Sequence, residues 1–237
     1  MTCLSIIQTV TARLGLNTTN AAVGATDEQI KQIVALSNEE GQELAARYPW
    51  TALQAEGSYT TLAAEDQGAL SSMTGVSNLL YIVNDTIWNR TLRRPVFGPR
   101  TQQSWQQQKA FAINGPWSSY RIKGSHLYMY PTPAAGQSCY FEYITKNWCT
   151  DSTGATGYDE WNADADVPVL DEQLIILGTI WRFKKAKGLE YAEDFNTYER
   201  RVMDAMGRDG GKDWLNLANT RYDIYPGVVV PAGSWNL

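Results

Sequence analysis

The sequence has few of the residues on which most enzyme active sites depend. It contains one histidine, His126, and three cysteines, Cys3, Cys139 and Cys149. A Ser-His-Asp or Cys-His device would have to use His126 as its base, and no nucleophile elbow or glycine-rich phosphate loop accompanies it. Since the cysteine number is odd and no C-x-x-C pair occurs, we expect three reduced thiols, without a disulfide or structural zinc. We expect a protein that is not an enzyme and needs no cofactor or metal.

The sequence also lacks a positive net charge and a long apolar run. Its formal net charge of -5 removes the broad attraction to phosphates that is typical of nucleic-acid binders. An acidic surface still suits a protein past which DNA slides without sticking, because each neutralising cation would add to the affinity. No apolar run approaches the roughly 18 residues of a membrane span, and no basic stretch precedes an apolar one at the N-terminus. We expect neither a membrane contact nor a recognisable signal peptide.

Helical periodicity is present near the N-terminus. A short apolar stripe predicts a helix over residues 3–14, ended by Gly15. A longer helix is predicted from Thr26 to about Tyr48, because apolar or small residues return to one face every three or four positions. Thr26 and Gln29 have the spacing of a capping box, and Pro49 cannot continue the helix. The residues expected on the inner face of the longer helix are Ile30, Val34, Ser37, Gly41, Leu44 and Tyr48.

A pair of helices is predicted near the other end, over residues 171–187 and 189–206. Asp171 suits the N-cap of the first helix, Gly188 makes the corner, and Gly207 ends the second. Trp181 and Phe195 are expected to meet between the two helices. The faces expected to be buried contain Leu174, Leu177, Gly178 and Trp181 in the first helix, and Tyr191, Phe195, Tyr198, Val202 and Met206 in the second.

The middle of the chain indicates short strands and turns. Gly124 and Ser125 form the turn of the clearest hairpin, and the strand after it is expected to complete a three-stranded meander. A glutamine-rich helix capped by Thr101 is predicted over residues 101–111. Residues 151–168 are rich in glycine and aspartate and predict a surface loop. The expected strands are 58–62, 78–83, 120–123, 126–130 and 138–145.

These elements predict an α+β fold with three parts. Residues 1–56 and 165–207 are expected to form a helical bundle domain, and residues 57–164 an inserted β-rich domain. Residues 208–237 contain paired glycines, prolines and an apolar run without helical period, and are expected to form an extended C-terminal arm.

Several short patterns together resemble a known family. They are Tyr48-Pro49-Trp50, the stretch from Asn84 to Arg90, Gly98-Pro99 followed by a helix with Trp105, and Leu177-Gly178 with Trp181-Arg182. This combination resembles the head-to-tail adaptor proteins of tailed phages, above all those of short-tailed phages related to tail tubular protein A, over most of residues 1–206. The resemblance implies a helical bundle carrying a β-rich insertion, and a ring, usually of twelve copies, between portal and tail nozzle.

The resemblance also implies a location and partners. The chain is expected to be made in the host cytoplasm and to become a structural virion protein at the head-to-tail junction, where it lines the DNA exit channel. The implied partners are the portal protein, a tail nozzle or tail tube protein, other copies of the chain and, as a further candidate, a tail fibre or tailspike. DNA is expected to pass without sequence-specific contact. We expect a mostly monomeric free chain that forms rings on a portal template.

An arginine-rich segment is the first candidate interface. Arginine pairs with phosphate and with carboxylates, and the flanking aromatic rings could stack on bases. Three interpretations remain open: pairing with carboxylates of the same or a neighbouring subunit, contact with a partner protein, and contact with DNA. The candidate residues are Trp88, Arg90, Arg93, Arg94, Phe97 and Arg100.

The C-terminal arm is the second candidate interface. We expect it to dock outside its own bundle, against a neighbouring subunit or the portal, because an extended apolar segment can add a strand to a sheet edge. The alternative, in which the arm folds back over its own β-region as a closing strand, remains open. The interface residues proposed in the arm are Tyr222, Tyr225, Val229 and Trp235.

Three further patterns are weak indications of a metal, catalytic or carbohydrate-binding site. Asn162, Asp164 and Asp166 alternate like the start of a calcium loop, but the glycine and closing glutamate are absent, so we expect a solvated acidic loop. Asp159 and Glu160 are adjacent, which does not suit two carboxylates facing one glycoside. Nine tryptophans and thirteen tyrosines make a carbohydrate-binding virion module the alternative function, although such rings also fill cores and subunit interfaces.

Overall fold

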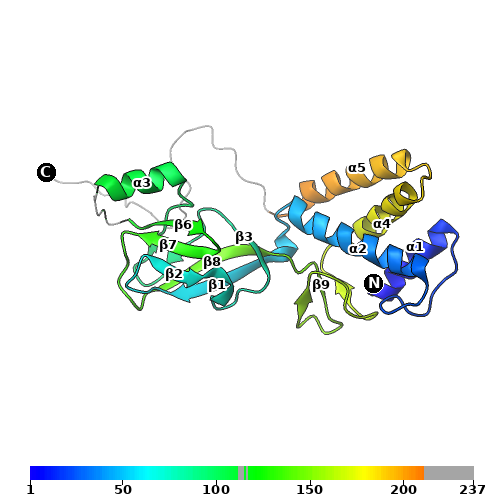
Figure 1. Cartoon of the computed structure of the whole chain (residues 1–237), viewed down its shortest axis with the longest axis horizontal. Helices are drawn as coiled ribbons and strands as arrows, with labels where there is room; N and C mark the ends of the chain where they lie inside the picture. The colour runs from blue at the N-terminus through cyan, green and yellow to red at the C-terminus, as the bar shows by residue number, and fades with distance from the viewer. Residues whose placement is uncertain (112–114, 116, 211–237) are drawn as a thin grey trace, which may run out of the picture.

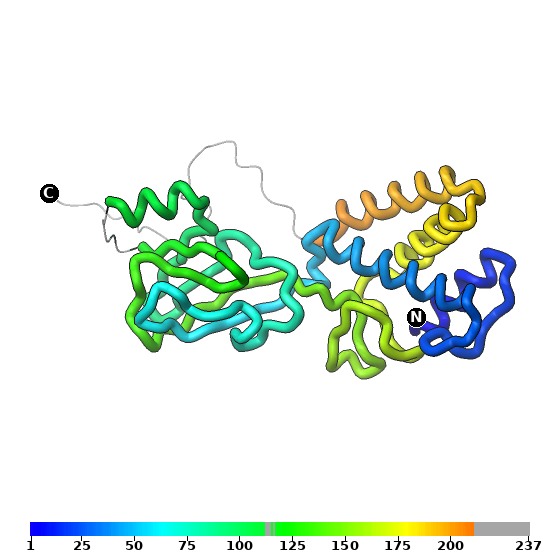
Figure 2. The backbone as a smooth tube through the Cα atoms, in the orientation of Figure 1, coloured from blue at the N-terminus to red at the C-terminus, as the bar shows by residue number. Residues whose placement is uncertain are grey.

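The computed structural model describes residues 1–111, 115 and 117–210, which form an α+β structure. Two groups of elements lie side by side along the long axis (Figure 1). We call residues 1–53 and 146–210 the helical lobe and residues 54–145 the β lobe, since each contains most of one buried cluster; Ile144 of the β lobe packs into the cluster of the helical lobe. The backbone enters the β lobe at its first strand and returns after Thr145 (Figure 2). Whether the lobes are separate domains with the predicted boundaries stays a prediction.

The helical lobe is built around one central helix. α4 (Glu172–Ala186) contacts α1 (Cys3–Leu14), α2 (Glu28–Arg47) and α5 (Ala192–Arg208). Its nine buried residues leave few positions facing water, as expected for a helix surrounded by others. Trp181 of α4 and Phe195 of α5 meet as predicted, with ring centroids 5.1 Å apart. Among the described residues, no helix has the length and apolarity needed to cross a bilayer.

The helix ends show which capping predictions hold. Gly15 ends α1 in the left-handed conformation, with φ 70°, and Asp171 caps α4 by accepting the amide hydrogen of Gln173 at 2.8 Å. The predicted Thr26 cap is wrong, because Asp27 caps α2 and accepts the amide of Gln29 at 2.8 Å. α5 continues through Gly207 to Arg208, since a glycine ends a helix only where the backbone turns left-handed.

The β lobe contains two antiparallel sheets and a helix. The hairpin of β6 (Ser119–Lys123) and β7 (His126–Tyr130) is confirmed. α3 (Gln102–Phe111) lies along it with Trp105 against Tyr130, ring centroids 6.3 Å apart. Short 3-10 turns precede β1 at Thr51–Leu53 and follow β2 at Leu70–Ser72. The five-stranded sheet consists of β1 (Gln54–Thr60), β8 (Ser138–Thr145), β4 (Trp88–Asn89), β5 (Arg94–Pro95) and β3 (Leu79–Ile82), and the three-stranded sheet of β2 (Asp66–Ala69), β7 (His126–Tyr130) and β6 (Ser119–Lys123).

The predicted meander is wrong. β8 does not follow β7 in the same sheet but pairs with β1 along its whole length, from Gln54 opposite Ile144 to Thr60 opposite Ser138. β7 has β2 as its second neighbour. The β1–β8 pair buries Tyr59 and Phe141 on one face, with rings 6.2 Å apart. Burial of this aromatic face stabilises a long-range pairing over the nearest one in sequence.

The predicted surface loop at residues 151–168 is also wrong, because it forms part of a small sheet. β9 (Cys149–Thr150) pairs with β10 (Gly157–Tyr158) and with β11 (Val167–Pro168). Trp148 and Trp161, with ring centroids 4.6 Å apart, pack into the core of the helical lobe. Gly41 of α2 lies directly against the Trp148 indole, where any Cβ would overlap the ring.

Candidate interaction surface

The arginine-rich residues lie on a short ribbon at the side of the five-stranded sheet. We call residues 88–100 the arginine ribbon; β4 within it pairs with β8 on one side and with β5 on the other. Asn89 is 4% exposed and fixes the turn. Its Nδ2 donates to Gln137 Oε1 at 2.7 Å, and its Oδ1 accepts the amide of Leu92 at 2.9 Å. The ribbon therefore presents exposed arginines from a backbone held by a buried side chain.

Arg90 has an intramolecular role within the ribbon. Its guanidinium lies 3.5 Å from the centroid of the Tyr140 ring and donates to Glu56 Oε2 at 2.8 Å. Glu56 stands directly opposite Glu142 across β1 and β8, where two like charges repel. Arg90 offsets that repulsion, so pairing with a carboxylate of the same chain is present at this position.

Arg94 and Phe97 lie near a second aromatic residue, Trp117, whereas Trp88 lies near Arg90 and Arg93 is exposed in the turn. The Arg94 guanidinium lies 5.8 Å from the ring centroid of Trp117, and Phe97 meets Trp117 edge to face, also at 5.8 Å. Arg100 precedes α3, and its amide donates to the carbonyl of Tyr120 at 2.9 Å. Trp117 is 50% exposed. Trp117 was not predicted as an interface residue. The signal for its exposure was its position between Pro116 and two serines, outside any apolar periodic pattern.

A shallow hollow of about 280 Å³ lies around Arg90, beside the Glu56 and Glu142 pair of β1 and β8. It offers one arginine, two carboxylates and two aromatic rings at the surface. This combination suits contact with a protein, in which Trp, Tyr and Arg contribute most to affinity. The lining residues are Glu56, Thr86, Trp88, Arg90, Tyr140, Phe141 and Glu142.

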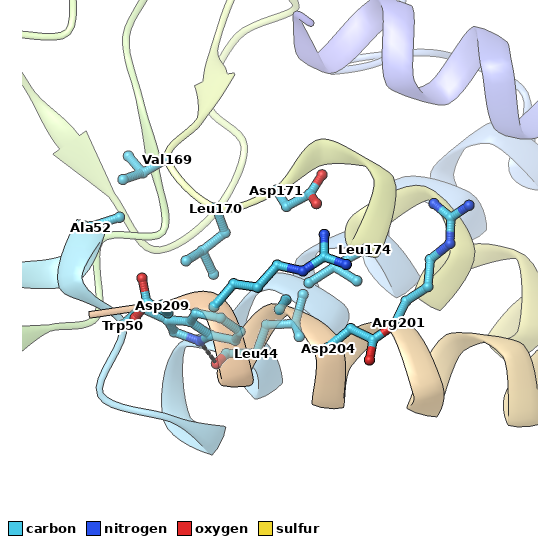
Figure 3. A pocket seen from close by; sticks show the side chains of 12 residues that line it. Leu44, Trp50, Ala52, Val169, Leu170, Asp171, Leu174, Arg201, Asp204 and Asp209 are labelled. Carbon is cyan, nitrogen blue, oxygen red and sulfur yellow. Dashed lines mark hydrogen bonds between the residues drawn. The ribbon is translucent and has the colours of Figure 1, made fainter. Parts of the chain in front are cut away.

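A second hollow of about 590 Å³ lies in the helical lobe, between the start of α4 and the end of α5. Figure 3 shows Trp50 and Leu170 among the side chains that line it, with Arg201 and Asp204 projecting from α5. Trp50 Nε1 donates to the carbonyl of Leu44 at 2.7 Å, which holds the ring in place. Since its walls come from four separate segments, no local sequence signal could have found it.

A buried ion cluster ties α2 to α4. Arg182 donates to Glu40 at 2.7 Å and to Glu39 at 2.6 Å, and it also pairs with Glu43. Burial raises the pKa of Glu40 above its ordinary value, with the charge of Arg182 acting in the opposite direction. Gly178 permits the contact, because a Cβ there would overlap the Glu40 carboxyl. Arg182 and Glu40 are buried at the centre of the cluster, whereas the Glu39 and Glu43 side chains are more than half exposed.

His126 of β7 has a structural partner in β2. His126 Nδ1 lies 3.0 Å from Asp66 Oδ2, and the amide hydrogen of Gly68 is the main reason that the pKa of Asp66 is lowered. Within residues 1–111, 115 and 117–210, no three His, Cys, Asp or Glu side chains are grouped to hold a metal. The candidates Tyr222, Tyr225, Val229 and Trp235 lie outside the described residues.

The expectation of a solvated acidic loop is wrong for Asp164 and Asp166, whose carboxylates accept backbone hydrogen bonds. Asp166 is 3% exposed, and its Oδ2 accepts the amides of Asn162 and Ala163 at 2.7 and 2.8 Å. Asp164 Oδ1 accepts the amides of Ala22 and Val23 at 2.9 and 2.7 Å. These carboxylates satisfy backbone donors that would otherwise be unpaired, and so connect the loop after α1 to residues 162–166.

Comparison with known protein families identifies the chain as a phage structural adaptor, a virion component. The SU10 adaptor protein family matches residues 1–222, and the chain belongs to this family. The resemblance to head-to-tail adaptors seen in the short sequence patterns is thereby confirmed at the level of the family. A search of the curated proteins finds no match.

Proposed function

We propose that the protein is a head-to-tail adaptor, which forms a ring that joins the portal vertex of a phage head to the tail. Membership of the SU10 adaptor protein family over residues 1–222 carries this proposal. The two lobes support it, since each has its own core and its own exposed surface. One subunit can therefore contact the portal with one lobe and a tail nozzle or tail tube protein with the other. A tail fibre or tailspike is a further candidate partner.

The ring is formed by other copies of the chain, with twelve as the expected number. The arginine ribbon is one proposed contact surface in it, because it exposes cationic and aromatic side chains on a fixed backbone. The net charge of -5 suits a channel that genomic DNA traverses without sequence-specific contact. We propose assembly on the portal from monomers made in the host cytoplasm, with interface formation in place of catalytic turnover.

The test is assembly onto portal-bearing heads, made without this protein and then supplied with it. The variant Arg93→Glu/Arg100→Glu reverses two exposed charges of the ribbon, and Lys123→Glu, on the exposed end of β6, makes the same kind of change outside it. We expect the double variant to melt like the parent and fail to attach to heads, while Lys123→Glu attaches. If the double variant attaches normally, the ribbon is not part of the interface. If the parent protein does not attach to heads, the adaptor role is contradicted.

Carbohydrate binding is the second candidate function. The exposed Trp88 beside two carboxylates in the hollow of the β lobe favours it, because sugars stack on indole rings and bind carboxylates. A glycan array separates the two functions. Binding that disappears in Trp88→Ala supports a carbohydrate module, whereas an array without signal leaves the adaptor role.

A further inference from the structure

The five-stranded sheet has an edge at β3 that lacks a strand partner among the described residues. β3 pairs with β8 alone, Tyr81 opposite Ile144 and Ile82 opposite Tyr143. β8 is covered on its other side by β1. The outer edge of β3 therefore presents backbone donors and acceptors to a further strand, as edge strands do in general.

A groove of about 780 Å³ runs along this edge. Its far wall includes Ile122 and Ser125 from the tip of the β6–β7 hairpin. Tyr81 is 41% exposed and Ile122 36% exposed, so apolar surface faces water beside unpaired backbone. Soluble proteins normally cover such an edge, because it is a template for pairing with other chains. The apolar lining consists of Leu70, Val76, Leu79, Leu80, Ile82 and Pro99 in addition to these two side chains.

We propose that the C-terminal arm takes the fold-back alternative in place of docking outside the bundle, and that Val228–Val230 occupy this groove and pair with β3 as the outermost strand. Three consecutive valines have high β-propensity, and their branched side chains suit an apolar groove beside a pleated edge. Pro226 and Pro231 flank them. Proline is tolerated on edge strands and cannot donate to a further strand, so the new edge would resist pairing with another chain.

The described chain ends close to this groove. Asp209 accepts hydrogen bonds from the amide and the hydroxyl of Thr51, at 2.8 and 2.6 Å, which places Gly210 beside Thr51. The short turn that contains Thr51 leads directly into β1. Gln54 at the start of β1 is opposite Ile144, and Ile144 is opposite Tyr81. Gln54 and Tyr81 are therefore two strand spacings apart, roughly 10 Å.

The intervening chain is long enough for this path. About 18 residues separate Gly210 from Val228; they reach up to roughly 60 Å when extended and span roughly 25 Å as a flexible coil. A tether of this length gives a local concentration in the millimolar range. At micromolar protein concentration, the segment of the same chain therefore outcompetes the identical segment of a second copy for the groove. The closed edge keeps free subunits from pairing through β3, independently of the role proposed above.

Disulfide trapping in the full chain tests this placement. Tyr81→Cys combined with Val229→Cys puts one thiol on the groove and one on the segment, and Leu62→Cys combined with Val229→Cys is the control. Leu62 is 51% exposed and lies outside the groove, while the three native cysteines are buried. Under mild oxidation we expect the groove pair to become a cross-linked monomer on a non-reducing gel, and the control pair to remain reduced. Cross-linked dimers, or equal cross-linking of both pairs, overturn the proposal.

Hydrogen exchange gives a second readout in the uncross-linked chain. Val229→Pro removes the amide that would bond to β3, while Val229→Thr keeps both the amide and the branched Cβ. We expect slow exchange of the outward-facing β3 amides in the parent and in Val229→Thr, and loss of that protection in Val229→Pro. Equal β3 exchange in all three proteins contradicts the proposal.

Discussion

Replacing Arg182 with alanine perturbs the buried ion cluster that connects α2 and α4. The Arg182 side chain is 8% exposed and that of Glu40 is fully buried, whereas the Glu39 and Glu43 side chains are more than half exposed. Without Arg182, Glu39 and Glu43 can turn to water, but Glu40 remains as a buried charge without a cation. Breaking a buried pair by removing one partner costs about 3–5 kcal/mol.

The comparison variants have different expected costs. Glu39→Ala and Glu43→Ala each remove an exposed partner and should cost about 1 kcal/mol or less. Glu40→Met/Arg182→Met replaces both buried charges by apolar side chains of similar length, and should recover most of the stability lost in Arg182→Ala. For a chain of this size, the stability lost in Arg182→Ala corresponds to a fall in Tm of roughly 10 °C.

The pH dependence gives a further check on Arg182→Ala. Burial already raises the pKa of Glu40, and loss of the guanidinium raises it further. A carboxyl whose pKa is raised on folding stabilises the protein most below its ordinary pKa of about 4.3, and this contribution is lost as the pH rises. The deficit of Arg182→Ala relative to the parent, measured by urea unfolding, should therefore shrink from pH 7 towards pH 4. A cost below about 1 kcal/mol at pH 7, or a deficit that grows on acidification, refutes this reasoning.

Three other predictions concern the helical lobe and the thiols. Trp181→Ala should cost about 3–5 kcal/mol and Phe195→Ala clearly less, because Phe195 is 36% exposed; equal melting of both variants and parent contradicts this. The hydrogen bond from Arg47 lowers the pKa of Glu199. The ionised Glu199 therefore stabilises the fold above its ordinary pKa, and this stabilisation is lost on acidification. Glu199→Gln should lower the Tm at pH 7 more than at pH 3. Burial raises the pKa of Cys3 to about 12, and all three buried cysteines should resist a thiol reagent at pH 8 until the protein is unfolded.

Elements with a local cause could be predicted from the sequence. The α1 stop at Gly15, the Asp171 cap and the Gly124-Ser125 hairpin each depend on residues within a few positions. The meeting of Trp181 and Phe195 was also predictable, because the corner at Gly188 brings two adjacent helical faces together.

Features that depend on distant segments could not be predicted. Nothing local favours β1 over β7 as the partner of β8, since both alternate apolar and polar residues. β9, β10 and β11 have two residues each, which is too short for any periodicity. The candidate surface was predictable in part: the arginines were identified, but the Trp117 contact and the β3 groove arise only when separate loops and strands meet.

The most direct test of the adaptor role is electron microscopy of phage particles made with and without this protein. Particles with it should carry a ring at the portal vertex, continuous with the tail, and an antibody or tag on the chain should label that ring. Particles without it should have heads with portals but no attached tails. Tailed particles that form in its absence, or a label located elsewhere on the virion, would contradict the account.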